Sequence, residues 1–458
     1  MDFQTVRSTY PHFIYHDVDI CMGQNELKIA YHFEIEGLAS FHPAWEFPIS
    51  DGCIKPDLDT VRVFAFNLGM VELVSYWKAT CSPNVSIRAA GLSPQQVAWW
   101  KKLYFGGLGE FFYINHISTS VDDFMHIQAE HEMSPLPSLP SDKLAGNLIP
   151  IGGGKDSIVT LDLLREMHTD NLCFIVNPTK ARLATCETAG YTEAQVIIAK
   201  RTLDKNLLLL NKQGFFNGHT PLSAIIAFSS ALAAHLYGKK YIILSNESSA
   251  NDYTVTEAEV NHQYSKSYEF EKDFHSYINA FLGGDLNYFS LLRPFCELQI
   301  AKHFAALPAF HPVFNSCNLG SKFDGWCLNC PKCLFIYIML SAFLSQTEIE
   351  AIFSENILNA PKMQSAFEQL VGLQKNKPFE CVGSREEVNA AIIQTIRYME
   401  ARSEVLPRLL SLYKQTPLYA ENLLHPFDYA SYYDSDNLVP PEFERILRSS
   451  AMVKEHRV

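Results

Sequence analysis

The chain has 458 residues, enough for about three domains, and its 47% hydrophobic and 19% charged residues exclude a mainly disordered protein. Lys and Arg total 37 against 50 Asp and Glu, which gives a net charge of −13. Nucleic-acid binding usually needs a basic surface and no run of Lys or Arg is present, so we expect no nucleic-acid partner.

The cysteines indicate a reducing compartment. The chain has eleven Cys, and its first residues form neither the basic nor the apolar segment of a secretory signal. We therefore expect a cytoplasmic protein whose clustered Cys bind metal or take part in catalysis. Residues 213–238 lack charged side chains, but their apolar part, 222–237, is short and contains Ser and His. This part predicts a buried helix, and we expect no membrane partner.

Residues 1–132 are predicted to form an N-terminal α+β domain. Two β-rich runs, 12–20 and 26–35, flank a turn at Gly23 and predict a hairpin. A short apolar run at 61–66 predicts another strand. Residues 94–112 predict a helix whose aromatic face packs into a core.

A linker and an α/β domain are predicted next. Residues 133–145 form the linker, because 133–140 contain three Pro. Residues 146–315 then alternate short apolar strands with helices, which is typical of a parallel sheet covered on both faces. The predicted strands are 148–151, 172–176, 195–199 and 241–244, and the predicted helices are 157–167 and 221–237. Ligands of such sheets bind at the carboxyl ends of the strands. Residues 316–458 are predicted to be a mostly helical, metal-binding C-terminal region.

A glycine-rich turn follows the first of these strands. It reads Gly152, Gly153, Gly154, Lys155, Asp156 and Ser157. Three consecutive Gly leave the backbone amides uncovered, and the helix that follows begins with unpaired amides and a positive dipole end. Together they form a cradle for a pyrophosphate, with a Lys cation beside it and an Asp that could hold Mg²⁺. Neither the Walker pattern nor the dinucleotide pattern fits this segment.

This turn resembles the SGGxDS signature of the PP-loop ATP pyrophosphatases, with Gly152 in place of the usual Ser. The resemblance implies a parallel-sheet PP-loop core in which residues 152–157 hold ATP and Asp156 holds Mg²⁺. It also implies cleavage of ATP between its α- and β-phosphates, with transfer of the adenylyl group to a substrate oxygen.

Four cysteines follow the α/β region. Cys317, Cys327, Cys330 and Cys333 have the spacing C-x9-C-x2-C-x2-C. Four thiolates can close a tetrahedral zinc site, which leaves no position for a reactive water and is therefore structural. An iron–sulfur cluster or unligated buried thiols also fit the spacing. A similar C-x8-C-x2-C-x2-C site in the PP-loop enzyme cyano-deazaguanine synthase favours zinc.

Two polar segments and one isolated cysteine remain. Residues 245–251 directly follow the strand at 241–244, at the sheet edge where ligand-binding loops lie, and residues 260–268 are dense in donors and acceptors. Solvated loops are the alternative interpretation of both. His219 precedes a buried helix, and a capping or core role and an active role are equally open for it. Cys381 is either a small buried side chain or a thiol that exchanges protons.

Several segments together resemble the MurL family, the UDP-N-acetylmuramoyl-L-alanyl-L-glutamate epimerases. They are residues 100–112, 152–157, 261–266, 326–333 and 377–383. The resemblance implies that ATP and Mg²⁺ are used to convert the terminal L-Glu of the peptidoglycan precursor to D-Glu, with release of AMP and diphosphate. The small-molecule partner would be the UDP-linked muramoyl dipeptide.

An ATP-adenylating fold is a reasonable host for an epimerase. Removing the α-proton beside a carboxylate is unfavourable, because the carbanion would lie next to an existing negative charge. An adenylated carboxyl group is neutral at the acyl carbon and can delocalise the carbanion. Two groups would then exchange the α-proton on opposite faces. We expect His262, Lys266 and Cys381 to be catalytic, with Cys381 opposite the base from the polar segments. The residues expected to bind the substrate are Asn246, Glu247, Asn261, Gln263, Tyr264 and Ser265.

Two other functions stay open. Another PP-loop adenylating enzyme, either a ligase like cyano-deazaguanine synthase or an RNA-modifying enzyme, would share the glycine turn. The first leaves the N-terminal region unexplained, and the second would need a basic surface. A zinc-stabilised sensor that binds ATP without turnover is the non-enzymatic alternative.

Overall fold

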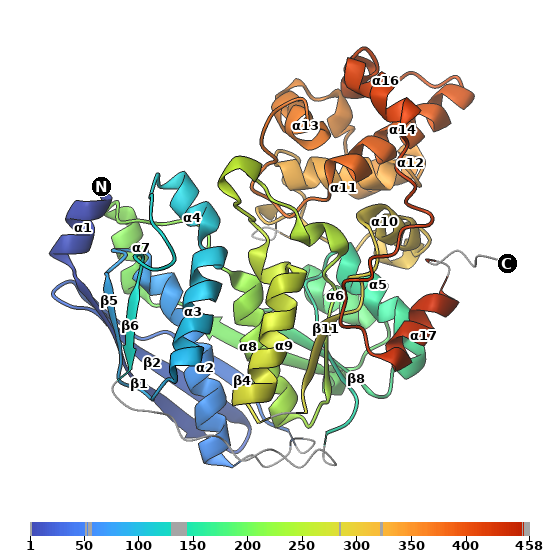
Figure 1. Cartoon of the computed structure of the whole chain (residues 1–458). Coiled ribbons are helices and arrows are strands. Elements are labelled where there is room, and N and C mark those ends of the chain that lie inside the picture. The colour runs from blue at the N-terminus through green and yellow to red at the C-terminus, as the bar shows by residue number, and fades with distance from the viewer. Residues whose placement is uncertain are drawn as a thin grey trace.

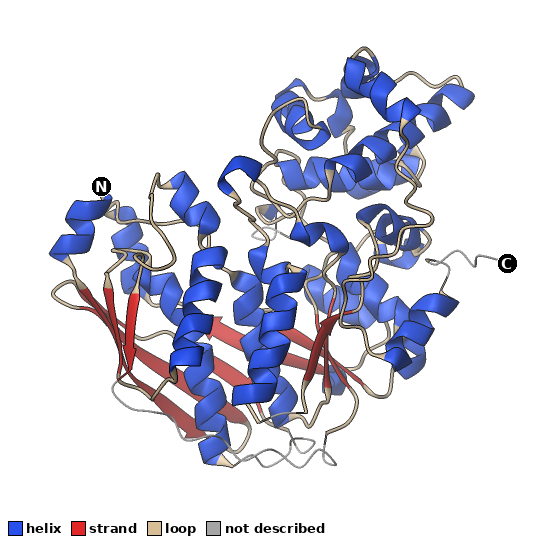
Figure 2. Ribbon diagram, in the orientation of Figure 1, coloured by secondary structure: helices blue, strands red, loops and turns tan. Residues whose placement is uncertain are grey.

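The computed structural model describes residues 2–50, 53, 57–129, 144–283, 285–320, 324–450 and 452. These residues form an α/β fold around one sheet of eleven strands (Figures 1 and 2). The main strand order is β11-β10-β7-β8-β9-β4-β2-β1-β5-β6, and β3 pairs with β2. The α/β class expected from the sequence is therefore confirmed.

The N-terminal half of the sheet is mixed. It follows helix α1 (Phe3–Thr9) and contains β1 (His12–Met22), β2 (Glu26–Ile35), β3 (Ala39–Phe41), β4 (Ala44–Pro48), β5 (Asn84–Ile87) and β6 (His126–Ala129). The predicted hairpin is present, because β1 and β2 pair antiparallel from Phe13–Ile35 to Met22–Leu27. Strands β5 and β6 add in parallel beyond β1.

One predicted strand in this half is wrong. Residues 61–66 lie inside helix α2 (Leu58–Trp77), which Asp57 caps through the amide of Thr60. The helix is buried along nearly its whole length, so it has no polar face to reveal a helical period. The helix predicted at 94–112 is present but divides at Leu108 into α3 (Pro94–Gly107) and α4 (Gly109–Ile114).

The other half of the sheet is parallel. It consists of β7 (Asn147–Pro150), β8 (Asn171–Val176), β9 (Val196–Thr202), β10 (Tyr241–Leu244) and β11 (Asn287–Ser290). The four predicted strands are confirmed, and β11 is additional. Along the chain β8 and β9 add on one side of β7, and β10 and β11 add on the other. The crevice between β7 and β10 is therefore the topological switch point of the sheet, where ligands of such folds bind.

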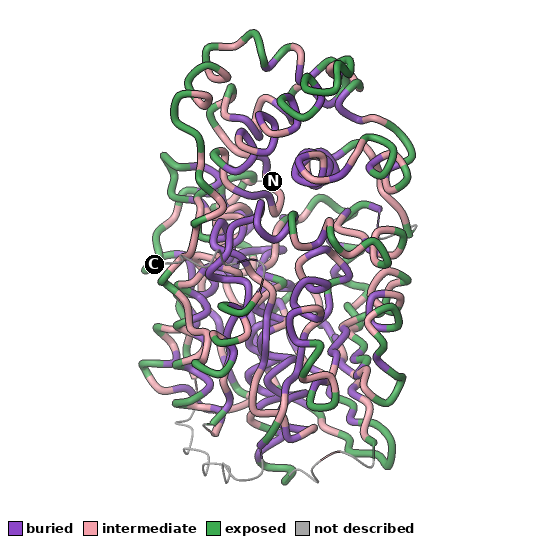
Figure 3. Tube along the Cα trace, turned by 90° about the vertical axis from the view of Figure 1, so that its right-hand side faces the viewer, coloured by how far each residue is buried: buried purple, intermediate pink, exposed green. Residues whose placement is uncertain are grey.

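The sheet separates two hydrophobic cores. Successive residues of one strand point to opposite cores, as Leu148 and Ile149 do in β7. One core includes α8 (Leu222–Leu236) and α9 (Tyr268–Phe281), and the other includes α5 (Lys155–Leu163) and α10 (Glu297–Ala305). Buried segments accordingly run through the centre of the molecule, with exposed segments at its outside (Figure 3). Helices α6 (Lys180–Thr188) and α7 (Lys205–Lys212) follow β8 and β9.

The regions predicted as N-terminal domain and α/β domain share this one sheet. Strand β4 pairs antiparallel with β9, with Ala44, Trp45 and Glu46 opposite Thr202, Arg201 and Lys200. The Glu72 side chain in α2 binds both Arg201 and the indole nitrogen of Trp45, which fixes this junction. The predicted linker lies outside the described residues, apart from residues 144 and 145.

The C-terminal region is helical, as expected. Its helices are α11 (Pro331–Ser341), α12 (Gln346–Phe353), α13 (Gln364–Val371), α14 (Arg385–Ala401), α15 (Arg408–Lys414), α16 (Pro417–Leu424) and α17 (Pro441–Ser449). Figure 1 shows most of them grouped beyond one end of the sheet, whereas α17 returns to its side. There Phe443 packs on Tyr241 of β10 and Phe289 of β11. Among the described residues, no helix combines the length and apolar character needed to cross a membrane.

Candidate functional site

A cavity of about 340 Å³ opens at the switch point of the sheet. Its lining combines the carboxyl ends of β7, β8 and β10 with the start of α8 and with side chains from the C-terminal region. Several predicted site residues line it: Gly152, Gly154, Asp156, Ser157, Asn246, Lys266, Cys317 and Cys381. Residues far apart in the sequence therefore meet in one cavity.

The glycine loop, residues 152–154, forms one wall. Gly153 has φ +79°, and a Cβ there would lie 3.0 Å from the backbone nitrogen of Arg182. A Cβ on Gly154 would lie 2.7 Å from the Ser316 hydroxyl, whereas a Cβ on Gly152 would meet nothing within 4 Å. The first turn of α5 begins directly after the loop, and its leading amides have no partners within the helix. This wall can bind an anion.

Lys155 does not enter the cavity. Its side chain is fully buried and pairs with the carboxylates of Asp156 and Glu297. Burial raises the pKa of Glu297 to about 8, although Lys155 opposes the shift. Burial would also raise the pKa of Asp156, but Lys155 and Lys332 lower it. Lys155 thus keeps Asp156 ionised at the cavity wall, instead of extending into the cavity as the mobile cation expected from the sequence.

The Cys381 sulfur also belongs to the lining and lies among cations. The Lys266 ammonium is 3.3 Å from it, and Lys332 donates a hydrogen bond to the Cys381 carbonyl. Burial would raise the pKa of the thiol, but Lys266, a hydrogen bond with His262, and Lys332 lower it to about 6. The same sulfur raises the pKa of Lys266. At neutral pH the group is therefore a thiolate beside an ammonium, not an inert buried thiol.

His262 lies in contact with this thiolate. Its Nδ1 pairs with the Glu110 carboxylate, and burial would lower its pKa, but hydrogen bonds with Cys381 and Glu110 raise it to about 9. His219 approaches the same Glu110 oxygen at 3.3 Å, and its pKa falls to about 4 through burial and the nearby His262. His262 and Cys381 are therefore neighbours, and they do not face each other across a substrate as the sequence suggested.

The residues expected to bind substrate divide into three groups. Asn246 lines the cavity, and Glu247 is buried and raises the pKa of Lys266. Asn261 and Tyr264 line a separate cavity of about 650 Å³. Gln263 and Ser265 are buried, and the backbone N–H of Gln263 donates a 2.7 Å hydrogen bond to the side-chain oxygen of Asn261.

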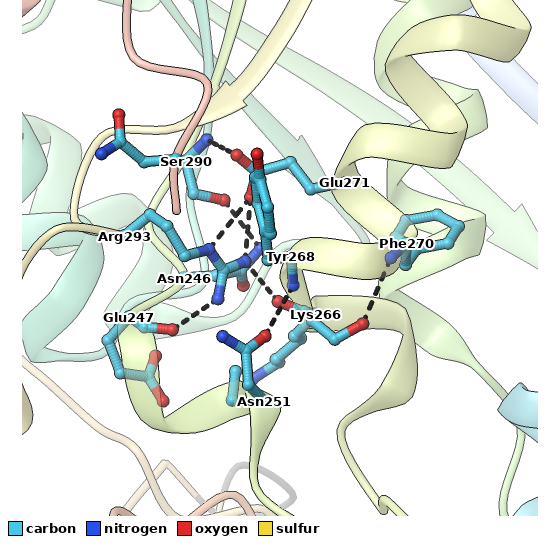
Figure 4. A network of polar contacts seen from close by, with 12 residues as sticks. Asn246, Glu247, Asn251, Lys266, Tyr268, Phe270, Glu271, Ser290 and Arg293 are labelled. Atoms are coloured by element: carbon cyan, nitrogen blue, oxygen red, sulfur yellow. Dashed lines mark hydrogen bonds and ion pairs between the residues drawn. The ribbon is translucent and has the colours of Figure 1, made fainter. Parts of the chain in front are cut away.

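Arg293 holds the two polar segments together. Its guanidinium donates hydrogen bonds to the carbonyls of Glu247 and Lys266 and to the Glu271 carboxylate, at 2.9 Å in the last case (Figure 4). Arg293 and Glu271 are both fully buried, and Glu271 also accepts a 3.0 Å bond from the Ser290 amide. This network fixes the backbone at Glu247 and at Lys266, and thereby restricts where the Lys266 ammonium lies.

The four predicted cysteine ligands meet in one cluster. The sulfurs of Cys317 and Cys330 are 3.9 Å apart, those of Cys327 and Cys333 3.7 Å, and those of Cys330 and Cys333 3.5 Å. Four sulfurs about 2.3 Å from a tetrahedral zinc ion would be about 3.8 Å apart. The cluster could therefore hold a zinc ion.

The cysteine cluster is connected to the glycine loop. The Asn315 amide donates a 2.8 Å hydrogen bond to the Gly153 carbonyl, and the Asn315 side chain accepts one of 2.7 Å from the Cys317 amide. The cysteine cluster and the glycine loop that lines the cavity are thus linked through one residue.

Sequence reasoning missed four charged or titratable residues of the site. They are Glu110, His219, Glu297 and Lys332; for His219 the sequence leaves a capping or core role and an active role equally open, without assigning it to the site. A possible signal for Glu110 was its position after Gly106, Gly107 and Gly109, because repeated glycines indicate close backbone packing.

Comparisons with known proteins match nearly the whole chain. The family model for the MurL N-terminal domain matches residues 4–291, and that for the MurL C-terminal domain matches residues 313–420. No solved structure matches the chain.

Three curated relatives are named UDP-N-acetyl-alpha-D-muramoyl-L-alanyl-L-glutamate epimerase. The protein from Xanthomonas oryzae pv. oryzae is 34% identical over 333 residues, 71% of this chain and 72% of the relative. That from Salinispora tropica is 33% identical over 341 residues, 71% of each chain. That from a Micromonospora species is 33% identical over 336 residues, 71% of this chain and 73% of the relative.

Proposed function

Because the chain belongs to the MurL family, we propose that it converts the terminal L-Glu of UDP-N-acetylmuramoyl-L-alanyl-L-glutamate to D-Glu, using ATP and releasing AMP and diphosphate. The observation that supports this proposal most is the cavity at the switch point. It combines an anion-binding glycine loop with a thiolate from a distant part of the chain. The glycine loop suits activation of a carboxylate by ATP, and the thiolate suits removal of a proton.

The glycine loop would hold the phosphates of ATP, as in PP-loop enzymes. The free amides at the start of α5 favour negative charge. Asp156 is ionised at the cavity wall, so it would hold Mg²⁺ together with the phosphate oxygens. A carboxylate oxygen of the substrate attacks the α-phosphorus, the bond to the β-phosphate oxygen breaks, and diphosphate leaves. The resulting acyl-adenylate carries no carboxylate charge beside the α-carbon.

Cys381 would then act as the base. A thiolate with a pKa of about 6 is charged at neutral pH and still accepts a proton from a weak carbon acid. It removes the α-proton, and the electron pair delocalises into the adenylated carboxyl group. A second acid, which exchanges its proton with solvent, returns a proton to the opposite face of this planar species, and hydrolysis by water then releases AMP and the D-glutamyl product. Lys266 would bind the thiolate and a substrate oxygen, while His262 would stabilise the thiolate form of Cys381 through its hydrogen bond.

Solvent isotope incorporation tests this function. The protein is incubated with UDP-N-acetylmuramoyl-L-Ala-L-Glu, ATP and Mg²⁺ in D₂O. The glutamyl product is followed by NMR, and the release of AMP is measured in the same samples. We expect AMP, diphosphate and D-glutamyl product carrying deuterium at the α-carbon. Tight ATP binding with no AMP from this substrate would instead support the nucleotide sensor, and AMP formed only with an unrelated acceptor would support another adenylating reaction.

Variants separate the two half-reactions. Asp156→Ala should abolish AMP formation because the metal and phosphates lose their ligand, while the fold is retained. Cys381→Ala should still bind ATP but lose epimerisation by at least about 100-fold, the usual contribution of a general base. Undiminished AMP release by Asp156→Ala would exclude the glycine loop as the ATP site. Full epimerisation by Cys381→Ala would exclude the thiolate as the base.

A further inference from the structure

Three glycines allow the corner between α3 and α4 to approach two other segments closely. A Cβ on Gly106 would lie 2.7 Å from the Tyr264 ring, and one on Gly107 would lie 2.8 Å from the Cβ of Pro221. Gly109, at the start of α4, lies against Val260 at the ordinary contact distance of 3.4 Å. Side chains at the first two positions would push the corner away from both segments.

The close approach places Glu110 between two histidines. Its carboxylate pairs with Nδ1 of His262 and lies 3.3 Å from Nδ1 of His219. The two imidazole rings have centroids 4.7 Å apart. The backbone of each histidine is also held by a hydrogen bond. Lys78 donates a 3.1 Å hydrogen bond to the His219 carbonyl, and the His262 amide donates one of 3.2 Å to the Thr254 hydroxyl.

The chain of contacts continues to the cavity. His262 interacts with Glu110 through Nδ1 and also makes a side-chain hydrogen bond with Cys381. Glu110 and His262 are both largely buried, with side chains 12% and 11% exposed, and neither lines the cavity, whereas Cys381 does. The order carboxylate, imidazole, thiol is the arrangement that orients and charges a reactive sulfur in other enzymes.

We propose that Glu110 is a positioning residue, whose carboxylate orients the His262 ring and keeps it protonated, so that His262 in turn keeps Cys381 a thiolate at the cavity. This role deepens the proposed epimerisation and rests on it for its catalytic meaning. The charge state of Cys381 can nevertheless be measured without substrate or ATP.

Several charged groups lie close to Glu110, His262 and Cys381, which we call the relay. These groups determine how much the loss of the Glu110 charge would change the pKa of Cys381. Lys266 and Lys332 lie beside Cys381, and His219 and Glu380 lie near His262. The two lysines remain when Glu110 is neutralised, so the thiolate should become less favoured but not disappear. The protonated imidazole would lose its ion pair with the Glu110 carboxylate and keep only its contact with Cys381, so its protonated form would be less favoured.

The test measures the pH dependence of Cys381 alkylation. Wild-type protein and Glu110→Gln are treated with iodoacetamide across a pH series, and the modified Cys381 peptide is quantified by mass spectrometry. We expect the midpoint to rise by about one pH unit in Glu110→Gln, a tenfold smaller thiolate fraction at low pH. Glu257→Gln is the matched control, because Glu257 forms an exposed pair with Lys375. It should keep the wild-type midpoint.

A double-mutant cycle shows whether a shifted midpoint in Glu110→Gln comes from the loss of its contact with His262 or from poor folding of the variant. His262→Gln should raise the midpoint as well, and Glu110→Gln should add no further change in that background, because its effect passes through His262. In turnover, Glu110→Gln should lower kcat with little change in KM, and Glu110→Asp should restore part of it. An unchanged midpoint in Glu110→Gln overturns the proposal, whether or not epimerisation is observed.

Metal analysis distinguishes the relay from a metal site. Glu110, His219 and His262 could also bind a metal ion, because their ligand atoms lie within 4.8 Å of one another. We expect the same zinc content in wild type and Glu110→Gln. A loss of one zinc ion per chain in Glu110→Gln would overturn the positioning role and assign these residues to a second metal.

Discussion

Cys381 shows how neighbouring charges can reverse the effect of burial. A thiol removed from water ordinarily keeps its proton, because the thiolate loses its hydration. Here Lys266 lies 3.3 Å from the sulfur and His262 hydrogen-bonds to it, and their combined effect exceeds the cost of burial. The residue is therefore charged because of which segments meet there, and not because of its own position in the sequence.

The pH profile of activity follows from this pair. The thiolate forms as pH rises through about 6, and His262 stays protonated until about 9. We expect kcat/KM to be maximal between these values, falling tenfold per unit below about 6 and falling again above about 9. Steady-state assays of AMP release with saturating ATP would measure it. Activity that rises without limit up to pH 10 would contradict a thiolate–imidazolium pair.

The glycine loop gives a second prediction for single residues. Gly153→Ala should destabilise the protein by about 1–2 kcal/mol, because its positive φ and its contact with Arg182 both oppose a Cβ. Gly152→Ser should leave stability unchanged, because a Cβ at this position would have no neighbouring atom within 4 Å. Urea unfolding of both variants measures the difference. Equal stability of the two would argue against the loop conformation described here.

Among elements, strands with strong local patterns were predictable. The hairpin of β1 and β2 and the short apolar strands β7, β8 and β10 could be identified from composition and spacing. The error at residues 61–66 arose because a fully buried helix and a buried strand have the same apolar content over six residues. The pairing of β4 with β9 could not be predicted, because it depends on contacts between distant segments.

The site was predictable to a similar extent. The glycine loop and the cysteine cluster are local motifs, and the structure gathers the four cysteines as expected. Apart from the glycines that precede it, Glu110 had no local signature, because its role depends on the packing of α3 and α4 against residues near 219 and 262. The contact between His262 and Cys381 was equally hidden, because the two come from segments more than a hundred positions apart.

The buried pair of Arg293 and Glu271 gives a prediction at the scale of elements. Arg293→Met should reduce stability by about 3–5 kcal/mol, because Glu271 would remain buried without its cation. Since Arg293 also holds the carbonyls of Glu247 and Lys266, ATP-dependent activity should fall with it. Arg448→Met, which removes an exposed helix-surface pair, is the control and should unfold at nearly the wild-type denaturant concentration.

For the whole molecule, the C-terminal region completes the cavity. The ends of β7 and β10 supply one side, and Cys317, Lys332 and Cys381 supply another from segments beyond the sheet. Lys332 lies between two cysteines of the cluster, and its side chain reaches the Cys381 carbonyl. The cysteine cluster thus belongs to a wall of the cavity that the sheet alone does not provide, and a metal ion bound there would stabilise that wall.

Metal removal should therefore affect both stability and ligand binding. We expect about one zinc ion per chain in purified protein, measured by mass spectrometry. Cys330→Ser should lose the metal, unfold several degrees lower and bind ATP more weakly, because Asn315 connects the cluster to the glycine loop. A metal-free wild-type protein of full stability would contradict a structural zinc site.

The antiparallel junction in the sheet also bears on how the chain is made. The ribosome releases β4 well before β9 exists, so the backbone groups of Ala44–Glu46 that later pair with Thr202–Lys200 begin without a partner. An unpaired strand edge is a template for wrong association, and such long-range pairing forms slowly. Nascent chains stalled before β9 should therefore depend on chaperones, and fragments ending there should aggregate when the complete chain does not.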